Sequence, residues 1–157
     1  MPLEHIHPII VHFPIVFVVT LFALDLFAAL RGRAATGKGD AFTTTSTVNA
    51  VGAGAFALLA MAVGDVAAEI AEGKGLSATV AQFLETHEAL GSATAILIAV
   101  WAFIRGWFWY KDRRVSGAGA WALVGVDAAI LALVVATAWF GGNLVYEYGV
   151  NVAALQH

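Results

Sequence analysis

Three histidines stand where an imidazole could bind a metal ion or a haem. His7 and His12 lie inside "HPIIVHFP" (residues 7–14), which is otherwise apolar, and His87 stands far along the chain at the start of another apolar stretch. A buried imidazole must find a partner or cost free energy, and imidazole is the commonest protein ligand for metals. The chain has no cysteine, which excludes thiolate-bound iron–sulfur clusters and covalently attached haem within it.

The composition places these histidines in a membrane protein. Of the 157 residues, 61% are hydrophobic and 12% are charged, against about 25% charged residues in soluble domains. Four apolar stretches, at about 8–30, 48–70, 87–110 and 117–140, each reach the roughly 20 residues that span a bilayer core. The sequence therefore predicts one domain over residues 1–157, an all-α integral membrane four-helix bundle in up-down-up-down order.

The basic residues predict the orientation of the bundle. Seven of the eight Lys and Arg residues follow the first stretch or end the third: Arg31, Arg33, Lys38, Arg105, Lys111, Arg113 and Arg114. By the positive-inside rule these segments are cytoplasmic, and both termini lie outside. No basic residue precedes the first stretch, so we expect an uncleaved spanning helix and not a signal peptide. No contiguous basic segment suggests a nucleic-acid partner.

Glycines and prolines punctuate the predicted helices. Pro8 suits the first turn of a helix, whereas Pro14 should kink the helix because it leaves the carbonyl of Ile10 without its usual partner. The loop "RGRAATGKGDAFTTTST" reads as a linker, and residues 77–86 predict a short amphipathic helix at the outer interface. Gly141 and Gly142 are expected to end the fourth helix.

The spacing of His12 and His87 favours one haem between two helices. The first and third helices run in the same direction, so the two imidazoles lie at similar depth. Neighbouring axes are about 8–10 Å apart, which puts the diagonal helices of a bundle roughly 11–14 Å apart. That gap suits two side chains that reach one iron, and Gly91, one turn below His87, leaves room for a flat ring.

Other residues near the same surface would complete this haem site. His7 and Asn143 are placed to meet the propionates, and Tyr146 could orient a ligand ring through its second nitrogen. Two imidazoles would saturate the iron and leave it for electron transfer. The sequence therefore predicts a b-type cytochrome that exchanges electrons with a partner subunit or the quinone pool, and it shows no nucleophile or acid–base pair that would define an enzyme.

Two other classes of function remain open at the level of sequence. His7, Asp65 and Glu69, with His12 and His87, could bind a divalent ion such as zinc or copper. Alternatively the histidines only join helices by hydrogen bonds, in a cofactor-free anchor or structural subunit of a larger complex. Homo-oligomers are compatible with all of these functions.

Two acidic residues lie deeper, toward the inner half of the bundle. Asp25 is expected to extend toward Arg31 near the end of its own helix. Asp127 has no partner close in sequence, and Asn49 or Thr20 could supply one. Ionisable residues inside a bilayer are rare and usually face the bundle interior, but the sequence does not assign a role to either acid.

The motifs "HPIIVHFP", His87 at the start of the third helix, and "GGNLVYEYGV" (residues 141–150) resemble a bacterial family of small four-helix membrane proteins of unknown function. The pattern matches at His7, Pro8, His12, Pro14, His87, Gly141, Gly142 and Tyr146. Some members are fused to Rieske-type iron–sulfur domains, so the resemblance implies a respiratory or redox role in the bacterial cytoplasmic (inner) membrane. The distribution of basic residues puts the site toward the periplasmic or outer side, and we expect a redox partner on a separate chain.

Overall fold

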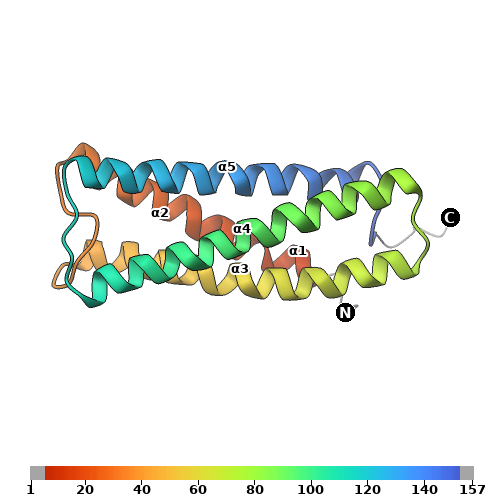
Figure 1. The fold of residues 1–157 in the computed structure, drawn as a ribbon, viewed down its shortest axis with the longest axis horizontal. Coiled ribbons are helices and arrows are strands. Elements are labelled where there is room, and N and C mark those ends of the chain that lie inside the picture. The colour runs from red at the N-terminus through yellow and green to blue at the C-terminus, as the bar shows by residue number, and fades with distance from the viewer. Residues whose placement is uncertain (1–5, 153–157) are drawn as a thin grey trace.

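The bundle is built from one interrupted rod and three long helices (Figure 1). A computed structural model describes residues 6–152. The first rod consists of α1 (Ile6–Ile10) and α2 (His12–Leu30), and it is followed by α3 (Ala41–Gly73), α4 (Ala78–Tyr110) and α5 (Ala118–Tyr146). The rod and the three helices are each long and apolar enough to cross a membrane, which confirms the predicted all-α bundle of four membrane-spanning helices.

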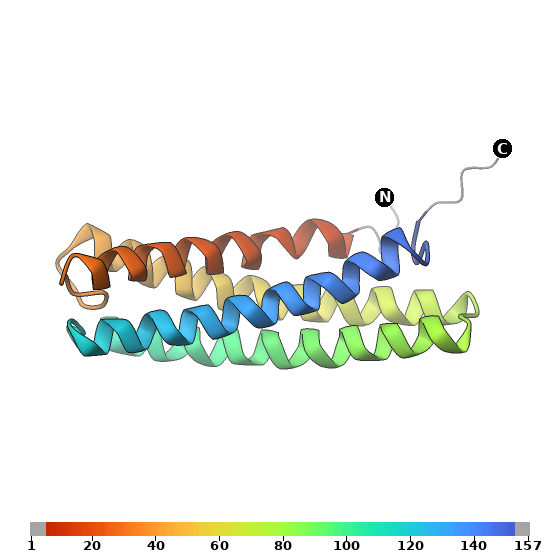
Figure 2. The same ribbon diagram turned by 90° about the horizontal axis from the view of Figure 1, so that it is seen from above.

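The helices alternate in direction, and the first rod lies diagonally opposite α4. Both α2 and α4 pack against α3 and α5, as the two views show (Figures 1 and 2). The described chain begins and ends at the end that also carries the short 74–77 connection, which we call the histidine end because His7 and His87 lie there. The opposite, basic end carries the connections 31–40 and 111–117 with six of the Lys and Arg residues.

Three helices extend beyond the predicted bounds. Residues 77–86, expected to form a separate interfacial helix, make the first turns of α4, whose N-terminus is capped by the Ser77 side chain. At the other end of the bundle α3 begins seven residues earlier than expected, with Asp40 as its cap. The α5 helix continues through Gly141 and Gly142 to Tyr146, because tertiary packing overrides the cost of about 1 kcal/mol for a helical glycine.

The predicted disruption by Pro14 falls one turn earlier. The helix is interrupted at Val11, between α1 and α2, directly after Ile10, whose carbonyl Pro14 cannot engage because it has no N–H. The Val11 N–H still donates to the His7 carbonyl at 3.1 Å. The interruption is therefore local, and α1 continues the direction of α2 (Figure 2).

The 31–40 connection is a folded plug and not the open linker that its composition suggested. Ala35 and Thr36 are fully buried, and the Ala35 N–H donates to the Val115 carbonyl at 2.9 Å. Where this connection meets α3, the Asp40 carboxylate accepts the Phe42 N–H at 2.9 Å. That hydrogen bond, with the neighbouring Arg33 guanidinium, holds the pKa of Asp40 below its usual range.

Small residues allow α3 and α4 to pack closely. A Cβ on Gly54 would lie 2.6 Å from the Ala102 Cβ and 3.3 Å from the Ala99 Cα. Such contacts between small side chains are typical of helix pairs in membranes, where van der Waals packing drives association. Gly54 therefore sets the separation of these two helices.

We expect Gly54→Ala to destabilise the bundle by about 1–3 kcal/mol, because an overpacked core forces backbone shifts. Gly125→Ala is the matched control, since a Cβ there meets nothing within 4 Å. The free energy of unfolding in detergent, measured by denaturant titration, compares the two variants. Equal stability of both would show that the α3–α4 contact tolerates the added methyl group.

Candidate functional site

His7 and His87 face each other at the histidine end. His7 comes from α1 and His87 from α4, which belong to the diagonal pair of rods. The two ring centroids are 6.4 Å apart, and the ring planes are nearly perpendicular, at 85°. Both side chains are half-buried. The structure thus brings two imidazoles together across the bundle axis.

His7 is held by the helix beside it through a backbone carbonyl. Its Nδ1 lies 3.0 Å from the Ala60 carbonyl oxygen of α3. Gly64 stands four residues after Ala60, and a Cβ there would lie 3.0 Å from His7 Cε1. Residues four apart share one helix face, so the missing side chain at Gly64 is what lets the imidazole reach this carbonyl.

His87 is held in the same way by α5. Its Nδ1 lies 3.1 Å from the Thr137 carbonyl oxygen, and Gly141 stands four residues further on. A Cβ at Gly141 would lie 2.8 Å from His87 Cε1. The two halves of the bundle therefore hold a histidine in the same way. A backbone carbonyl binds the ring nitrogen, and a glycine one turn later leaves space for the ring.

These hydrogen bonds fix the tautomer of both neutral imidazoles. A carbonyl oxygen only accepts hydrogen bonds, so Nδ1 of His7 and of His87 must carry the proton and donate it. In the neutral ring Nε2 then bears the free lone pair, and this is the atom that can bind a metal. A histidine that ligates a metal usually donates its other ring N–H to a carbonyl or carboxylate in this way.

The structure does not bring His12 and His87 together, which corrects the predicted pairing. His12 is exposed on the surface of α2, and its Nδ1 lies 2.5 Å from the Pro8 carbonyl oxygen of the same rod. His7 and His12 are five residues apart, or about 140° around a helix. Only one of them can face the bundle axis, and His7 occupies that position.

The other residues predicted for the haem site lie apart from the two rings. Gly91 faces α5, where a Cβ would lie 3.7 Å from the Thr137 Cγ2. The Asn143 amide donates to the Trp139 carbonyl of its own helix at 2.7 Å. Tyr146, at the end of α5, is 87% exposed. Within residues 6–152 the structure shows no hydrogen bond from Asn143 or Tyr146 to either imidazole.

The alternative metal site is not assembled from protein side chains. Asp65 and Glu69 both lie on the exposed face of α3. Among residues 6–152, no three His, Cys, Asp or Glu side chains come close enough together to hold a metal ion. The histidine pair is thus a two-ligand arrangement.

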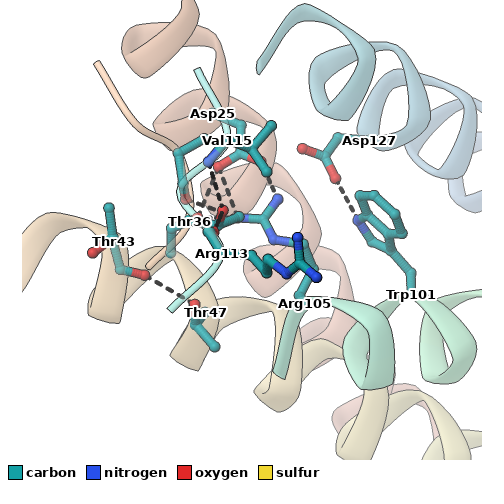
Figure 3. A network of polar contacts seen from close by, with 11 residues as sticks. Asp25, Thr36, Thr43, Thr47, Trp101, Arg105, Arg113, Val115 and Asp127 are labelled. Carbon is teal, nitrogen blue, oxygen red and sulfur yellow. Dashed lines mark hydrogen bonds and ion pairs between the residues drawn. The ribbon is translucent and has the colours of Figure 1, made fainter. Parts of the chain in front are cut away.

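A second polar cluster lies nearer the basic end. Arg105 and Asp25 are both fully buried and form an ion pair through both guanidinium Nη atoms (Figure 3). Ser46 of α3 accepts from Arg105 Nη2 at 2.7 Å and donates to Asp25 Oδ1 at 2.7 Å. The Ala35 carbonyl of the plug accepts from the same Nη2 at 3.2 Å. Asp25 therefore pairs with Arg105 across the bundle. The predicted pairing of Asp25 with Arg31 was wrong.

Asp127 borders this cluster with fewer partners. The Trp101 Nε1–H donates to Asp127 Oδ1 at 2.8 Å (Figure 3). Asp127 Oδ2 and Arg105 Nε are buried without a hydrogen-bond partner in the described part of the chain. Asn49, one of the two expected partners, donates to the Thr45 carbonyl of its own helix.

The histidine pair and the ion pair occupy corresponding positions on the two diagonal rods. Eighteen residues separate His7 from Asp25, and eighteen separate His87 from Arg105. This spacing is five helical turns, so each pair of positions lies on one face, about 27 Å apart. The equal spacing puts His7 in phase with Asp25 and His87 in phase with Arg105, but spacing alone does not tell which face of each helix is inward.

Comparison with known proteins identifies a family and no characterised relative. The family model described as "Predicted membrane protein (DUF2231)" matches residues 4–154. No curated protein and no solved structure matches the chain.

Proposed function

This chain belongs to DUF2231, a family of predicted membrane proteins, and we propose that it is a b-type cytochrome with one haem between His7 and His87. The observation that most supports this proposal is the 6.4 Å separation of the two imidazole ring centroids. Two metal–imidazole bonds of about 2.0–2.1 Å, together with the distance from each ring centre to its nitrogen, span such a gap. Both rings also have the tautomer that leaves Nε2 free to ligate.

The number of available ligands favours haem over a bare ion. A protein-bound zinc ion takes four ligands in a structural site and three in a catalytic one, whereas the histidine pair supplies two. A porphyrin holds iron from four sides, so two imidazoles complete its coordination. A cofactor-free anchor would need only the Nδ1 hydrogen bonds, and the close approach of the two rings would then serve no purpose.

A haem with two histidine ligands supplies one-electron transfer. The chain's own residues hold its ligands: the Ala60 and Thr137 carbonyls orient the two imidazoles, as outer-shell partners do in metal sites. Within residues 6–152 the histidines are His7, His12 and His87, and one of these is on the surface. We therefore assign one haem, which exchanges electrons with a separate redox subunit or the quinone pool.

The distribution of charge supports the sidedness of this proposal. By the positive-inside rule the basic end is cytoplasmic, which puts the haem toward the periplasmic side of a bacterial inner membrane. The resemblance to proteins fused to Rieske-type domains supports a redox partner at that surface.

The direct test is the visible spectrum of the full chain, extracted in detergent from haem-replete cells. We expect a sharp Soret band and, after dithionite reduction, resolved α and β bands of a six-coordinate haem b. A colourless preparation overturns the cytochrome proposal. Elemental analysis of that preparation then separates the two alternatives, because bound zinc or copper indicates metal binding and the absence of both indicates an anchor.

Neighbouring glycines at the end of α5 provide a sharper test of the site. Gly141→Ala places a Cβ 2.8 Å from His87 Cε1, whereas a Cβ at Gly142 meets nothing within 4 Å. We expect Gly141→Ala to weaken haem binding by roughly 10- to 100-fold, the usual cost of disturbing an outer-shell contact. Haem titration followed at the Soret band measures the haem affinity of each variant. An equal loss of affinity in Gly142→Ala would contradict the proposal that Gly141 makes room for the His87 ring.

A further inference from the structure

The buried cluster near the basic end holds more acidic groups than cations. Asp25, Arg105 and Asp127 are each at most 1% exposed. One guanidinium can neutralise one carboxylate, so full ionisation of all three groups would leave a net negative charge in the bundle interior. An uncompensated charge in such a place costs several kcal/mol.

The two carboxyl groups belong to one cluster: Asp25 pairs with Arg105, and Asp127 accepts from Trp101, whose ring centroid lies 5.8 Å from Arg105 Cζ. Asp127 directs its second carboxyl oxygen toward the side of the cluster where Asp25 and Arg105 lie (Figure 3). Two carboxyl groups can share a hydrogen bond only if one of them is protonated, because an ionised carboxylate has no proton to donate. Asp127 Oδ2 receives no N–H or O–H donor from residues 6–152, and a proton bound to this oxygen would remove the unpaired negative charge.

We propose that Asp25 and Asp127 form a proton-binding site that holds one exchangeable proton between them. Asp25 receives the guanidinium and the Ser46 hydroxyl, so the charge resides mainly on Asp25 and the proton mainly on Asp127. Two carboxyl groups that border one buried guanidinium bind and release protons as a pair. The site lies about five helical turns from the histidine pair and does not depend on bound haem.

Residues of α3, α4 and the 31–40 plug surround Asp25 and Asp127. Ser46 faces it from α3, Arg105 and Trp101 face it from α4, and the Ala35 carbonyl reaches Arg105 from the plug. Among these groups Arg105 is the charged one. The 31–40 plug, which is bonded to the 111–117 connection through Ala35 and Val115, contacts Arg105 from the basic end, and we expect the proton to exchange with water at that end.

Infrared spectroscopy of the full chain in liposomes, with ¹³C-labelled aspartate side chains, tests this site. A protonated carboxyl group has a carbonyl-stretch band that ionised carboxylates lack. We expect one such band at neutral pH, shifted in ²H₂O because the proton exchanges. Asp127→Asn should abolish the band. Asp25→Asn should abolish it too, since each variant leaves one carboxylate for one guanidinium.

Two further variants keep this test decisive. Asp127→Glu retains an acid at the same place and should restore a shifted band, which separates loss of the proton from loss of the fold. Asp65→Asn, on an exposed face at the histidine end, should leave the band unchanged. No protonated band in the unmodified protein, or a band that persists in Asp127→Asn or Asp25→Asn, overturns the proposal.

Discussion

Replacing either His7 or His87 by alanine is expected to give a protein without a Soret band, whereas His12→Ala keeps the spectrum of the unmodified chain. The reason is geometric. His7 and His87 face each other with 6.4 Å between ring centroids, and His12 lies on the surface of α2 with a hydrogen bond inside its own rod. Visible spectra and haem content per chain measure all three variants.

The controls separate loss of a ligand from loss of the fold. Circular dichroism and gel filtration should show the same helical content and size for the three alanine variants. In His87→Gly, added imidazole can enter the vacated space and is expected to restore part of the spectrum. If His12→Ala is colourless while His7→Ala retains haem, the iron ligands are the pair first predicted from the sequence, and the ring contact in the structure is not the ligand pair.

The sequence was sufficient for the architecture because hydropathy in a membrane protein depends on many residues at once. The four apolar stretches, their order and the diagonal relation of the first and third could be predicted without knowledge of any single contact. Because hydropathy is averaged over many residues, it does not show at which residue a helix begins. Residues 78–86 contain polar groups and no long apolar run, yet they continue α4 because Ser77 caps the helix and Leu84 is buried in the bundle.

The choice between His7 and His12 depends on helix phase, which hydropathy does not report. Both histidines lie near one end of an apolar helix, and the "HPIIVHFP" segment carries no polar face to mark which side is inward. The decisive features are Gly64 and Gly141, each one turn beyond a carbonyl on a neighbouring helix. A single glycine has many explanations in a sequence, and only the packing of α3 and α5 gives these two their role.

Arg105 shows a limit of counting charges to assign topology. Five residues from the end of α4, it was assigned to the basic surface, but it is fully buried against Asp25. An arginine side chain is long enough to extend either to the interface or across the bundle. Its partner on a diagonal helix, together with Ser46 on a third, is visible only when the bundle is assembled.

Removal of Arg105 is expected to be the most destabilising change in the core. Arg105→Met retains the length of the side chain but leaves Asp25 without its cation, and breaking a buried pair costs about 3–5 kcal/mol. Adding Asp25→Asn to this variant should recover most of the loss, because the remaining Asp127 can stay neutral. The free energy of unfolding in detergent, measured for both single variants and the double variant, gives the coupling.

The exposed ion pair between Arg33 and Asp40 supplies the matched control. Its side chains are 45% and 42% exposed, so Arg33→Met removes the same charge from a place where water solvates the carboxylate that remains. We expect no measurable loss of stability there. If Arg33→Met and Arg105→Met cost the same, or if Asp25→Asn adds its own loss to that of Arg105→Met, then Asp25 does not depend on Arg105 for its charge compensation. The difference between the two sites would follow from burial alone, because the substituted side chain and the type of partner are identical.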